Sequence, residues 1–382
     1  MMYPTNLKTV IRSIKSGLTI RISGMLLFSL VSLPELRAQD PQFSQFYAAP
    51  LYINPAYTGN SDKWRAGTTY RSQWPSLDHS FETRSFYIDH FSSLISSGIG
   101  LIFNNYQESL LNFQSNEIGI SVSHALKLGD LQFIRNSRRK NDALYMRLGA
   151  QYTRVSRTAN FNDLIFGDQI DLINGEFVSA SGEVFDAGLD VIFPSISAGA
   201  LFYMENIWLG VAVNHLNEPN QAVSGQPDPL KTRLTIHGGF QLEMGAFRGL
   251  TRSRRGSRVR TMYETTLTVL TNYRNQGKSE QLDLGFQVFH GPVLWGLSYR
   301  GIPIRSVDGL LNNDALIGMF GVGLKFTDSS NITLAYSHDR TVSGLGGTTG
   351  GSHEITLTLR WGEQRARNYI PPCKGGDLNW KY

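Results

Sequence analysis

The segment Gln281-Leu282-Asp283-Leu284-Gly285-Phe286-Gln287-Val288 alternates polar and apolar residues along its whole length. Because successive side chains of a β-strand point to opposite faces, a strand here places two leucines, a phenylalanine and a valine on one face. The same alternation recurs in Glu117–Ser123 and in Glu354–Trp361. The pattern predicts strands with one apolar and one polar face.

Segments of this kind recur along most of the chain, and long helical patterns are absent. Most segments are close to the length of about 9–11 residues that a tilted strand needs to cross a bilayer. We therefore predict about fourteen strands. They are residues 62–71, 83–90, 98–107, 117–127, 144–155, 195–204, 207–216, 233–242, 262–273, 281–290, 292–299, 315–326, 332–339 and 353–361.

Two all-β architectures share this alternation. A soluble sandwich turns the apolar face inward, whereas an outer-membrane barrel turns it toward lipid and keeps a polar lumen. Strand length, an even strand number and aromatic residues near strand ends, as in an interfacial girdle, favour the barrel. The aromatic residues are Trp64, Trp74, Tyr106, Trp208, Trp295 and Trp361. The sequence predicts a transmembrane antiparallel β-barrel over residues 61–362, in a bacterial outer membrane.

Residues 1–38 have the order of a secretory signal peptide. Basic residues from Lys8 to Arg21 precede a short apolar run at 24–33, and Ala38 supplies a small residue at the expected cleavage site. These 38 residues hold five basic side chains and one acidic one, so their removal lowers the net charge from +5 to about +1. The nearly neutral remainder gives no electrostatic support for nucleic-acid binding.

Residues 39–60 are rich in aromatic residues and proline but follow neither the strand nor the helix pattern. Proline cannot join a ladder in mid-sheet, whereas the aromatic side chains need burial. One interpretation is a plug or latch in the lumen or at the periplasmic rim, in which Gln45 and Asn54 hydrogen-bond inward-facing polar groups. The other is an irregular lead-in needed only for assembly. The predicted anchors of the plug are Phe43, Phe46, Tyr47, Tyr52 and Tyr57.

With both termini in the periplasm, the connections near 156–194, 274–280 and 300–314 face outward, and most of the outward set is long, as in bacterial barrels. Two basic connections, 128–143 and 243–261, are long yet face the periplasm. Such charge runs are commonly solvated loops. The alternative is a docking surface for an acidic periplasmic partner or the cell wall. Its candidate residues are Arg252, Arg254, Arg255, Arg258 and Arg260.

No arrangement of residues indicates an enzyme, a cofactor or a metal site. Gly277-Lys278-Ser279 lacks the leading glycine of a phosphate loop, and the eight histidines lack the spacing of a zinc site. Glu264 and Asp283 are inward carboxylates of a kind that hydrolases use, but barrel lumens are normally polar. We predict no catalytic activity. Cys373, the only cysteine, lies in a tail (363–382) and has no partner for an internal disulfide.

Several motifs resemble the PorP/SprF family of type IX secretion system outer-membrane proteins. Asp40-Pro41-x-Phe43-Ser44-Gln45-Phe46-Tyr47 followed by Asn54-Pro55-Ala56-Tyr57-x-Gly59 is similar to the family's N-terminal signature. Arg71-x-Gln73-Trp74 and 166–171 resemble its next two elements. Tyr336-Ser337-His338-Asp339 with Ser352-His353-Glu354 resembles its last hairpin. The similarity extends over nearly all of 39–362.

The resemblance implies a non-catalytic barrel of the type IX secretion and gliding machinery. It implies protein partners: a large secreted surface adhesin that the barrel helps to export or retain, the secretion translocon and a periplasmic ring complex. The alternative is a porin-like channel for small solutes, for which a wide, water-filled lumen with charged rings is expected.

Overall fold

The computed structural model of the chain describes residues 40–61, 63–77, 80–92, 95–109, 113–130, 143–159, 189–222, 227–252, 258–307, 310–327, 329–343, 346–362 and 371–375. The predicted signal peptide, the motif at 166–171 and most of the connection 156–194 lie outside the described residues. The described residues from Pro41 onward belong to one compact unit.

Fourteen strands follow one another along the described part of the chain, one for each predicted segment. They are β1 (Trp64–Gln73), β2 (Phe81–Ser92), β3 (Ser97–Glu108), β4 (Phe113–Asp130), β5 (Ala143–Ala159), β6 (Leu189–Tyr203), β7 (Ile207–Asn214), β8 (Arg233–Arg252), β9 (Arg258–Gln276), β10 (Ser279–His290), β11 (Val293–Val307), β12 (Leu310–Thr327), β13 (Ser330–Thr341) and β14 (Ser352–Trp361).

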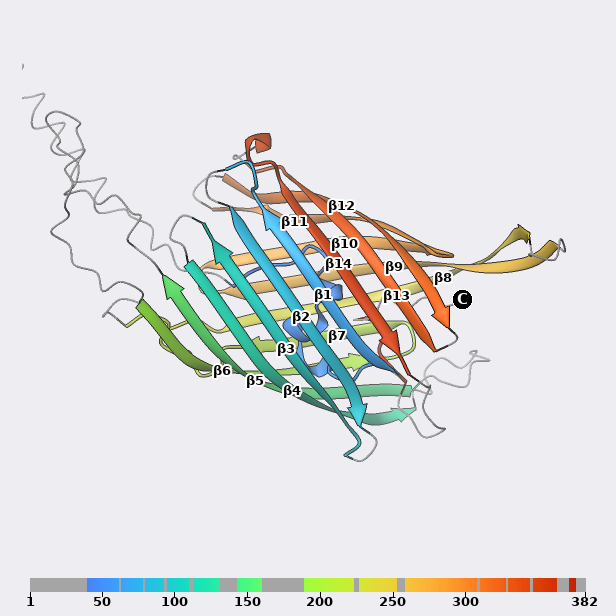
Figure 1. Cartoon of the computed structure of the whole chain (residues 1–382), viewed down its shortest axis with the longest axis horizontal. Helices are drawn as coiled ribbons and strands as arrows, with labels where there is room; N and C mark the ends of the chain where they lie inside the picture. The colour runs from blue at the N-terminus through green and yellow to red at the C-terminus, as the bar shows by residue number, and fades with distance from the viewer. Residues whose placement is uncertain are drawn as a thin grey trace, which may run out of the picture. The chain divides into compact units, whose positions relative to one another are not determined.

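The strands form a closed antiparallel barrel in which each strand pairs with its neighbours in sequence, and β1 pairs with β14 (Figure 1). The closing ladder runs from Trp64 opposite Trp361 to Gln73 opposite Ser352. We call the end with the first pair the terminal end and the end with the second pair the loop end. Closure removes the unpaired strand edges that a hydrocarbon environment does not tolerate. The predicted fold class is confirmed.

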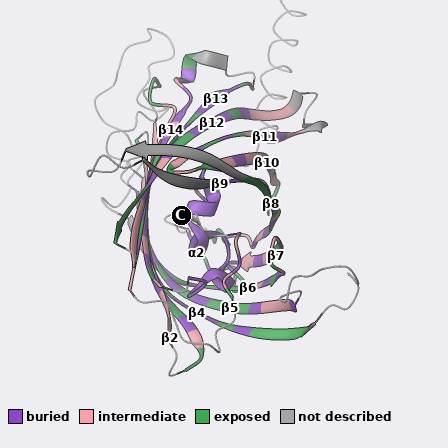
Figure 2. Ribbon diagram, turned by 90° about the vertical axis from the view of Figure 1, so that its right-hand side faces the viewer, coloured by how far each residue is buried: buried purple, intermediate pink, exposed green. Residues whose placement is uncertain are grey.

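The outer surface of the barrel is apolar, and Figure 2 shows how exposed and buried residues alternate along the strands. Leu334 and Ile355 face outward, whereas their sequence neighbours Thr333 and Thr356 are buried on the inner face. This orientation is that of a membrane barrel, since a soluble sandwich buries its apolar face. In the described part of the chain, no helix has the length and hydrophobicity to cross a membrane.

The aromatic residues at strand ends do not all belong to an interfacial girdle. Trp64 and Trp295 are exposed at the terminal end, as predicted. Trp208 is 4% exposed, and its place in the alternation of β7 turns it into the lumen, so the girdle assignment is wrong for this residue. Tyr106 also lies on the inner face, where its ring packs against Phe81 and Phe113.

Several strands are longer than the alternation predicts, because irregularities interrupt the pattern. The predicted outward connection 300–314 is mostly strand: the register of β11 against β12 shifts after Arg300, where Gly301 has a φ of +141°. The predicted connection 274–280 likewise shrinks to the turn between Gln276 and Ser279. A bulge breaks the two-residue period, so the alternation predicts a strand end there although the ladder continues.

The basic connection 243–261 is also mostly strand, which corrects the prediction of a loop. β8 continues to Arg252 and β9 starts at Arg258, and a register shift lies between Glu243 and Gly245. Beyond the shift the two strands project past their neighbours at the terminal end (Figure 1). Arg254 and Arg255 lie outside the described residues. The other basic connection, 128–143, is largely outside them as well.

Residues 41–60, the N-terminal segment, lie inside the ring of strands (Figure 2). The segment forms three short helical turns: η1 (Phe46–Ala48), α2 (Pro50–Ile53) and η2 (Pro55–Tyr57). Its residues are buried from Phe43 onward. The segment therefore packs its aromatic side chains without joining the sheet.

We expect the outer face to tolerate charge according to depth. Phe320 and Phe326 both lie on β12 and are exposed on the outer face, but Phe326 is one residue from the strand's terminal end. Phe320→Arg should lower the free energy of unfolding in lipid vesicles by about 2–4 kcal/mol and Phe326→Arg by about 0–1 kcal/mol. Denaturant titration followed by tryptophan fluorescence measures both. Equal losses would contradict the assigned lipid-facing surface.

Candidate functional site

The candidate site is the contact between the N-terminal segment and the inner wall of the barrel. The prolines that exclude this segment from a ladder start its helical turns, since Pro50 begins α2 and Pro55 begins η2. Proline suits a first helical position because the missing N–H would have no intrahelical acceptor. The Asn54 side chain caps η2 by accepting a hydrogen bond from the Ala56 N–H at 2.9 Å.

The first anchor joins Ser44 and Gln45 to the last hairpin of the barrel. The backbone N–H groups of Ser44 and Gln45 donate to the two carboxylate oxygens of Glu354 at 2.7 and 2.8 Å. The Gln45 amide donates to Ser337 Oγ at 3.2 Å and accepts from Thr356 Oγ1 at 2.7 Å. Gln45 is fully buried, and its amide group is satisfied by β13 and β14.

Buried charges surround this anchor. Arg71 lies 2.9 Å from Asp339 and 3.3 Å from Glu354, and its guanidinium also donates to Ser44 Oγ. Arg300 bridges Asp339 at 3.0 Å and Asp283 at 2.8 Å. These five side chains come from β1, β10, β11, β13 and β14 and are at most 4% exposed. Pairing is required here, because an isolated buried charge costs several kcal/mol.

A second charged group holds the end of the segment. Arg65 and Asp89 form an ion pair at 2.9 Å, and Asp89 accepts from the Gly59 N–H at 2.6 Å. Arg147 donates to the carbonyl oxygens of Ala56 at 3.1 Å and Thr58 at 2.7 Å. Arginine side chains therefore satisfy carbonyl groups at the end of η2 that have no partner within the turn.

Asn54 makes the central contact with the opposite wall. Its amide nitrogen donates to the Ala200 carbonyl at 3.1 Å and lies 3.0 Å from His237 Nε2, while the Tyr57 hydroxyl lies 3.2 Å from His237 Nδ1. Because the Asn54 oxygen already accepts from Ala56, the nitrogen is the atom that faces the imidazole.

Glycine on the wall permits this close approach. A Cβ atom on Gly199 would lie 2.0 Å from the Asn54 oxygen, and one on Gly149 would lie 2.3 Å from the backbone of Pro55 and Ala56. A Cβ on Gly98 would lie 2.1 Å from the Thr58 carbonyl. Gly59 itself has a φ of +63°, the left-handed region that glycine adopts without strain. The segment thus lies along wall positions that have no side chain, Gly98, Gly149 and Gly199, which we call the glycine track.

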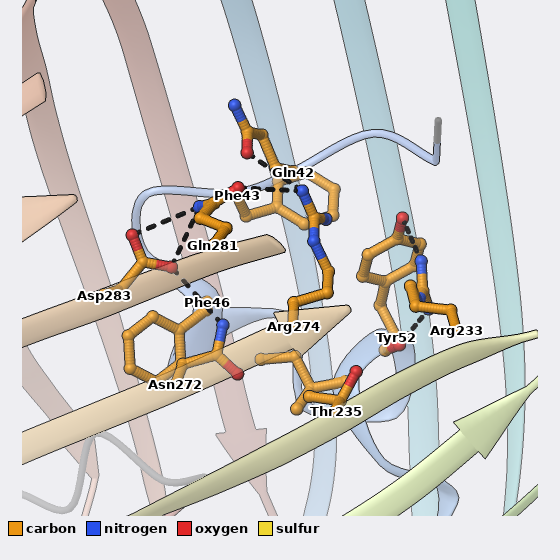
Figure 3. Close-up of a pocket in the computed structure, with 11 residues that line it drawn as sticks. Gln42, Phe43, Phe46, Tyr52, Arg233, Thr235, Asn272, Arg274, Gln281 and Asp283 are labelled. Carbon is orange, nitrogen blue, oxygen red and sulfur yellow. Dashed lines mark hydrogen bonds between the residues drawn. The ribbon is translucent and has the colours of Figure 1, made fainter. Parts of the chain in front are cut away.

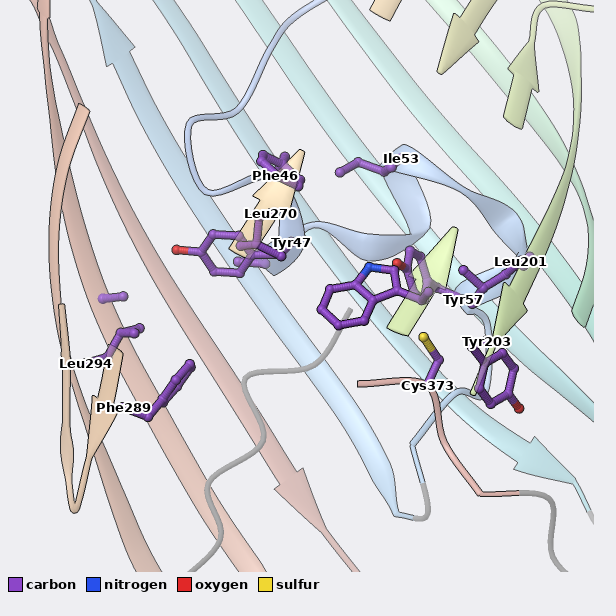
Figure 4. Close-up of a cluster of buried hydrophobic side chains, with 14 of the residues drawn as sticks. Phe46, Tyr47, Ile53, Tyr57, Leu201, Tyr203, Leu270, Phe289, Leu294 and Cys373 are labelled. Carbon is purple, nitrogen blue, oxygen red and sulfur yellow. The ribbon is translucent and has the colours of Figure 1, made fainter. Parts of the chain in front are cut away.

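The aromatic residues of the segment pack against apolar side chains on the inner wall (Figure 4). Phe46, Tyr47 and Tyr57 belong to one buried cluster with wall residues such as Leu270 and Leu294. Phe43 and Tyr52 belong to a second, and their rings meet edge to face at 5.1 Å. Burial raises the pKa of Tyr47 and Tyr57 well above the ordinary tyrosine value, so both hydroxyls keep their protons.

A pocket lies between the segment and strands β8 to β10 (Figure 3). On one side Arg233 donates to the hydroxyl of Tyr52 at 2.7 Å and lies over its ring at 4.4 Å. On the other, Arg274 donates to the Pro41 carbonyl at 3.0 Å and to Gln42 at 2.9 Å. Both arginines therefore contact the segment through neutral oxygen atoms, and Arg233 also through an aromatic face.

The described part of the C-terminal tail also reaches this interface. The Asn60 amide donates to the Cys373 carbonyl and accepts from the Cys373 N–H, both at 2.8 Å. Tyr203 donates to the Pro371 carbonyl at 2.9 Å. Cys373 is buried in the same cluster as Tyr57 and Trp208. It is an internal residue and not a surface thiol.

The structure brings together most of the predicted signature residues, but not all. Pro41, Phe43, Ser44, Gln45, Tyr47, Asn54, Pro55, Gly59, Arg71 and Glu354 meet at the interface. Asp40 is the first residue that the structure describes. Ser352 is buried on the inner face of the hairpin.

Two signature residues lie elsewhere. Trp74 is at the loop end with a φ of +58°, and its N–H donates to the Gly351 carbonyl at 2.8 Å. His353 faces outward, where its ring lies 4.7 Å from that of His338 and its Nδ1 lies 2.7 Å from the Tyr336 hydroxyl. The side chains of Arg252, Arg258 and Arg260 are not among the described groups.

Sequence reasoning missed the arginines and the histidine of the wall: Arg65, Arg147, Arg233, Arg300 and His237. Each lies on the polar face of an alternating strand, which signals an inward direction but not which residues meet. Asp283, considered as half of a hydrolase pair, is ion-paired with Arg300. Within the described residues no cluster of three or more His, Cys, Asp or Glu side chains suits a metal ion.

The family described as "Type IX secretion system membrane protein PorP/SprF" matches residues 35–359. Among solved structures, the chain is similar to the outer membrane protein Omp33 of Acinetobacter baumannii, at 8% identity, 80% coverage of this chain, 99% of that chain and a TM-score of 0.35. It is also similar to a FadL homologue of Pseudomonas aeruginosa, at 13% identity, 82% and 94% coverage and a TM-score of 0.39. Such low TM-scores carry no information about function. Curated proteins give no match.

We expect the loss of a buried charge to lower the free energy of unfolding far more than the loss of an exposed one. Arg71→Met leaves Glu354 without its buried cationic partner and Asp339 with Arg300 alone, and should lower the free energy of unfolding by about 3–5 kcal/mol. Arg84→Met removes an ion pair with Glu82 in which both side chains are at least one-third exposed, and should cost about 0–1 kcal/mol. Denaturant titration of both variants in the same vesicles gives the comparison. Similar losses would show that the Arg71 cluster does not hold the segment.

Proposed function

The chain belongs to the PorP/SprF family of type IX secretion system membrane proteins, and we propose that it serves as a non-catalytic scaffold whose lumen is closed by its own N-terminal segment. It is an outer-membrane β-barrel and a membrane component of the secretion system. In the proposed function, the barrel binds a large exported surface adhesin, helps to export or retain it, and contacts the translocon and the periplasmic ring complex.

The interior of the barrel carries this proposal. The N-terminal segment is held by two groups of buried charges and by aromatic side chains, and its signature residues provide most of these contacts. A solute channel would require a free path past these groups. The geometry therefore favours a closed barrel that acts through its two ends, rather than the porin-like alternative.

The two ends offer different surfaces for partners. We assign the terminal end to the periplasm, since short turns join strands there at 203–207, 290–293 and 327–330. The projecting β8–β9 hairpin lies at this end and carries Arg252, Arg258 and Arg260 on its strands and Arg254 and Arg255 between them. We propose that it docks an acidic periplasmic partner. The loop end, with the connection after β5, is proposed for the exported adhesin.

Purification from native membranes in mild detergent tests the partners. We expect a large exported surface protein to co-elute with the wild-type barrel, and isolated barrel alone would contradict the proposed function. In the same experiment, reversal of the five hairpin arginines to glutamate should abolish recovery of periplasmic proteins but leave the exported protein. Replacing the same arginines by lysine keeps the charge and should retain both. Unchanged recovery with glutamate would refute docking by the hairpin.

Electrical conductance tests closure of the lumen. Reconstituted wild-type barrel should conduct little, and deletion of residues 41–58 should raise the single-channel conductance several-fold because it removes side chains from the ring of strands. Heat-modifiable migration on gels checks that the deleted barrel still folds. A folded deletion variant with no rise in conductance would count against a plug and leave the lead-in interpretation.

A further inference from the structure

We propose that the terminal end of the barrel contains a peptide-binding groove, and that residues 371–375 of the chain occupy it in cis. The groove is formed by Asn60, Tyr203, Asn206 and Trp208, and Figure 4 shows Tyr203 and Cys373 as members of the buried cluster. Its ligand class is a polypeptide segment with a basic residue followed by glycine. The inference rests on the proposed function, which places this end of the barrel in the periplasm, so the source of a second segment is a periplasmic partner protein.

The groove recognises backbone, which makes its use by another polypeptide chemically reasonable. The Asn60 side chain pairs with both the N–H and the carbonyl of Cys373 at 2.8 Å, as a neighbouring strand would. Tyr203 takes the carbonyl of Pro371, two residues earlier. These three hydrogen bonds use backbone atoms that any polypeptide offers, provided that the residue in the position of Cys373 is not proline.

Two further contacts add side-chain selectivity. Lys374 Nζ lies 2.6 Å from Asn206 Oδ1 and 3.8 Å from Glu243 Oε1, so the groove places an acceptor and a carboxylate beside this position. At the next position a Cβ atom on Gly375 would lie 2.0 Å from Trp208 Nε1. The indole therefore admits glycine and rejects larger residues. Together these contacts select a basic residue followed by glycine.

The groove is continuous with the N-terminal segment. Asn60 ends that segment, and its N–H donates to the Tyr57 carbonyl at 3.0 Å. Arg65 donates to the same carbonyl at 3.1 Å and pairs with Asp89, which holds Gly59. A second polypeptide that displaces residues 371–375 would thus bind directly beneath the segment that fills the barrel.

The tether between the tail and the barrel determines how well a free peptide competes with residues 371–375 for the groove. An occupant joined to the same chain through a short linker has an effective concentration on the order of millimolar, so a free peptide at micromolar concentration should not displace it. Removal of the tail should therefore expose a site that the full chain conceals.

Binding of a fluorescent peptide of residues 369–376, with serine replacing cysteine, tests this proposal. The chain truncated after Arg365 should bind it roughly 100-fold more tightly than the full chain. Asn60→Ala in the truncated chain should weaken binding roughly 10- to 100-fold, since two hydrogen bonds are lost. A peptide with Gly375→Val should not bind. Equal binding of the valine peptide, or none by a truncated chain with native heat-modifiability, would overturn the groove.

The full chain provides a second measurement that does not depend on truncation. Cys373 is the only cysteine and is buried, so its reaction with a maleimide reports release of the tail. Labelling should be slow in the wild type and faster in Asn60→Ala or with millimolar peptide. Rates that neither change affects would also overturn the proposal. Co-purification of an exported protein despite these failures would leave the proposed function standing.

Discussion

The fold depends on one constraint: backbone N–H and C=O groups in hydrocarbon must all be paired within the protein. Closure of β1 onto β14 satisfies it and fixes two faces, one toward lipid and one toward the lumen. The inner face then holds side chains such as Arg65, Arg147 and Arg300 away from bulk water. Because these charges are buried, they require partners inside the barrel. Carboxylates of the wall and the N-terminal segment together provide these partners.

The buried charges explain why the segment takes one position. Hydrophobic contacts alone tolerate sliding, since they lack direction. Glu354, which accepts from two consecutive N–H groups, and Asp89, which accepts from Gly59, define where the segment starts and ends. Buried ion pairs add little net stability when compared with apolar packing. Their contribution here is therefore to position the segment, and the glycine track in the wall provides the room.

The last hairpin shows how one motif serves two surfaces. Because the strand period is two, Ser337, Asp339 and Glu354 point inward to the segment, while His338 and His353 meet each other on the outer face. A family motif that reads as continuous sequence is thus divided between lumen and exterior. The N-terminal segment and the described part of the C-terminal tail also meet at the terminal end, through Asn60 and Cys373. The interior is therefore built from strands, the N-terminal segment and residues of the C-terminal tail.

The sequence by itself determined the strand number, the barrel and its lipid-facing side, because alternation is a local property that a bilayer enforces on every strand. Through the resemblance to a family signature it also identified residues of the segment and two of the wall residues that hold it, Arg71 and Glu354. It did not predict that β8 continues past Gly245 and β11 past Gly301, since bulges break the two-residue period while strand pairing continues. Only the tertiary structure decided which charges meet, that Trp208 faces the lumen and that Cys373 pairs with Asn60, because those contacts join residues separated by up to 313 positions. The spacing of residues in the sequence does not show which of them lie close together across a closed ring of strands.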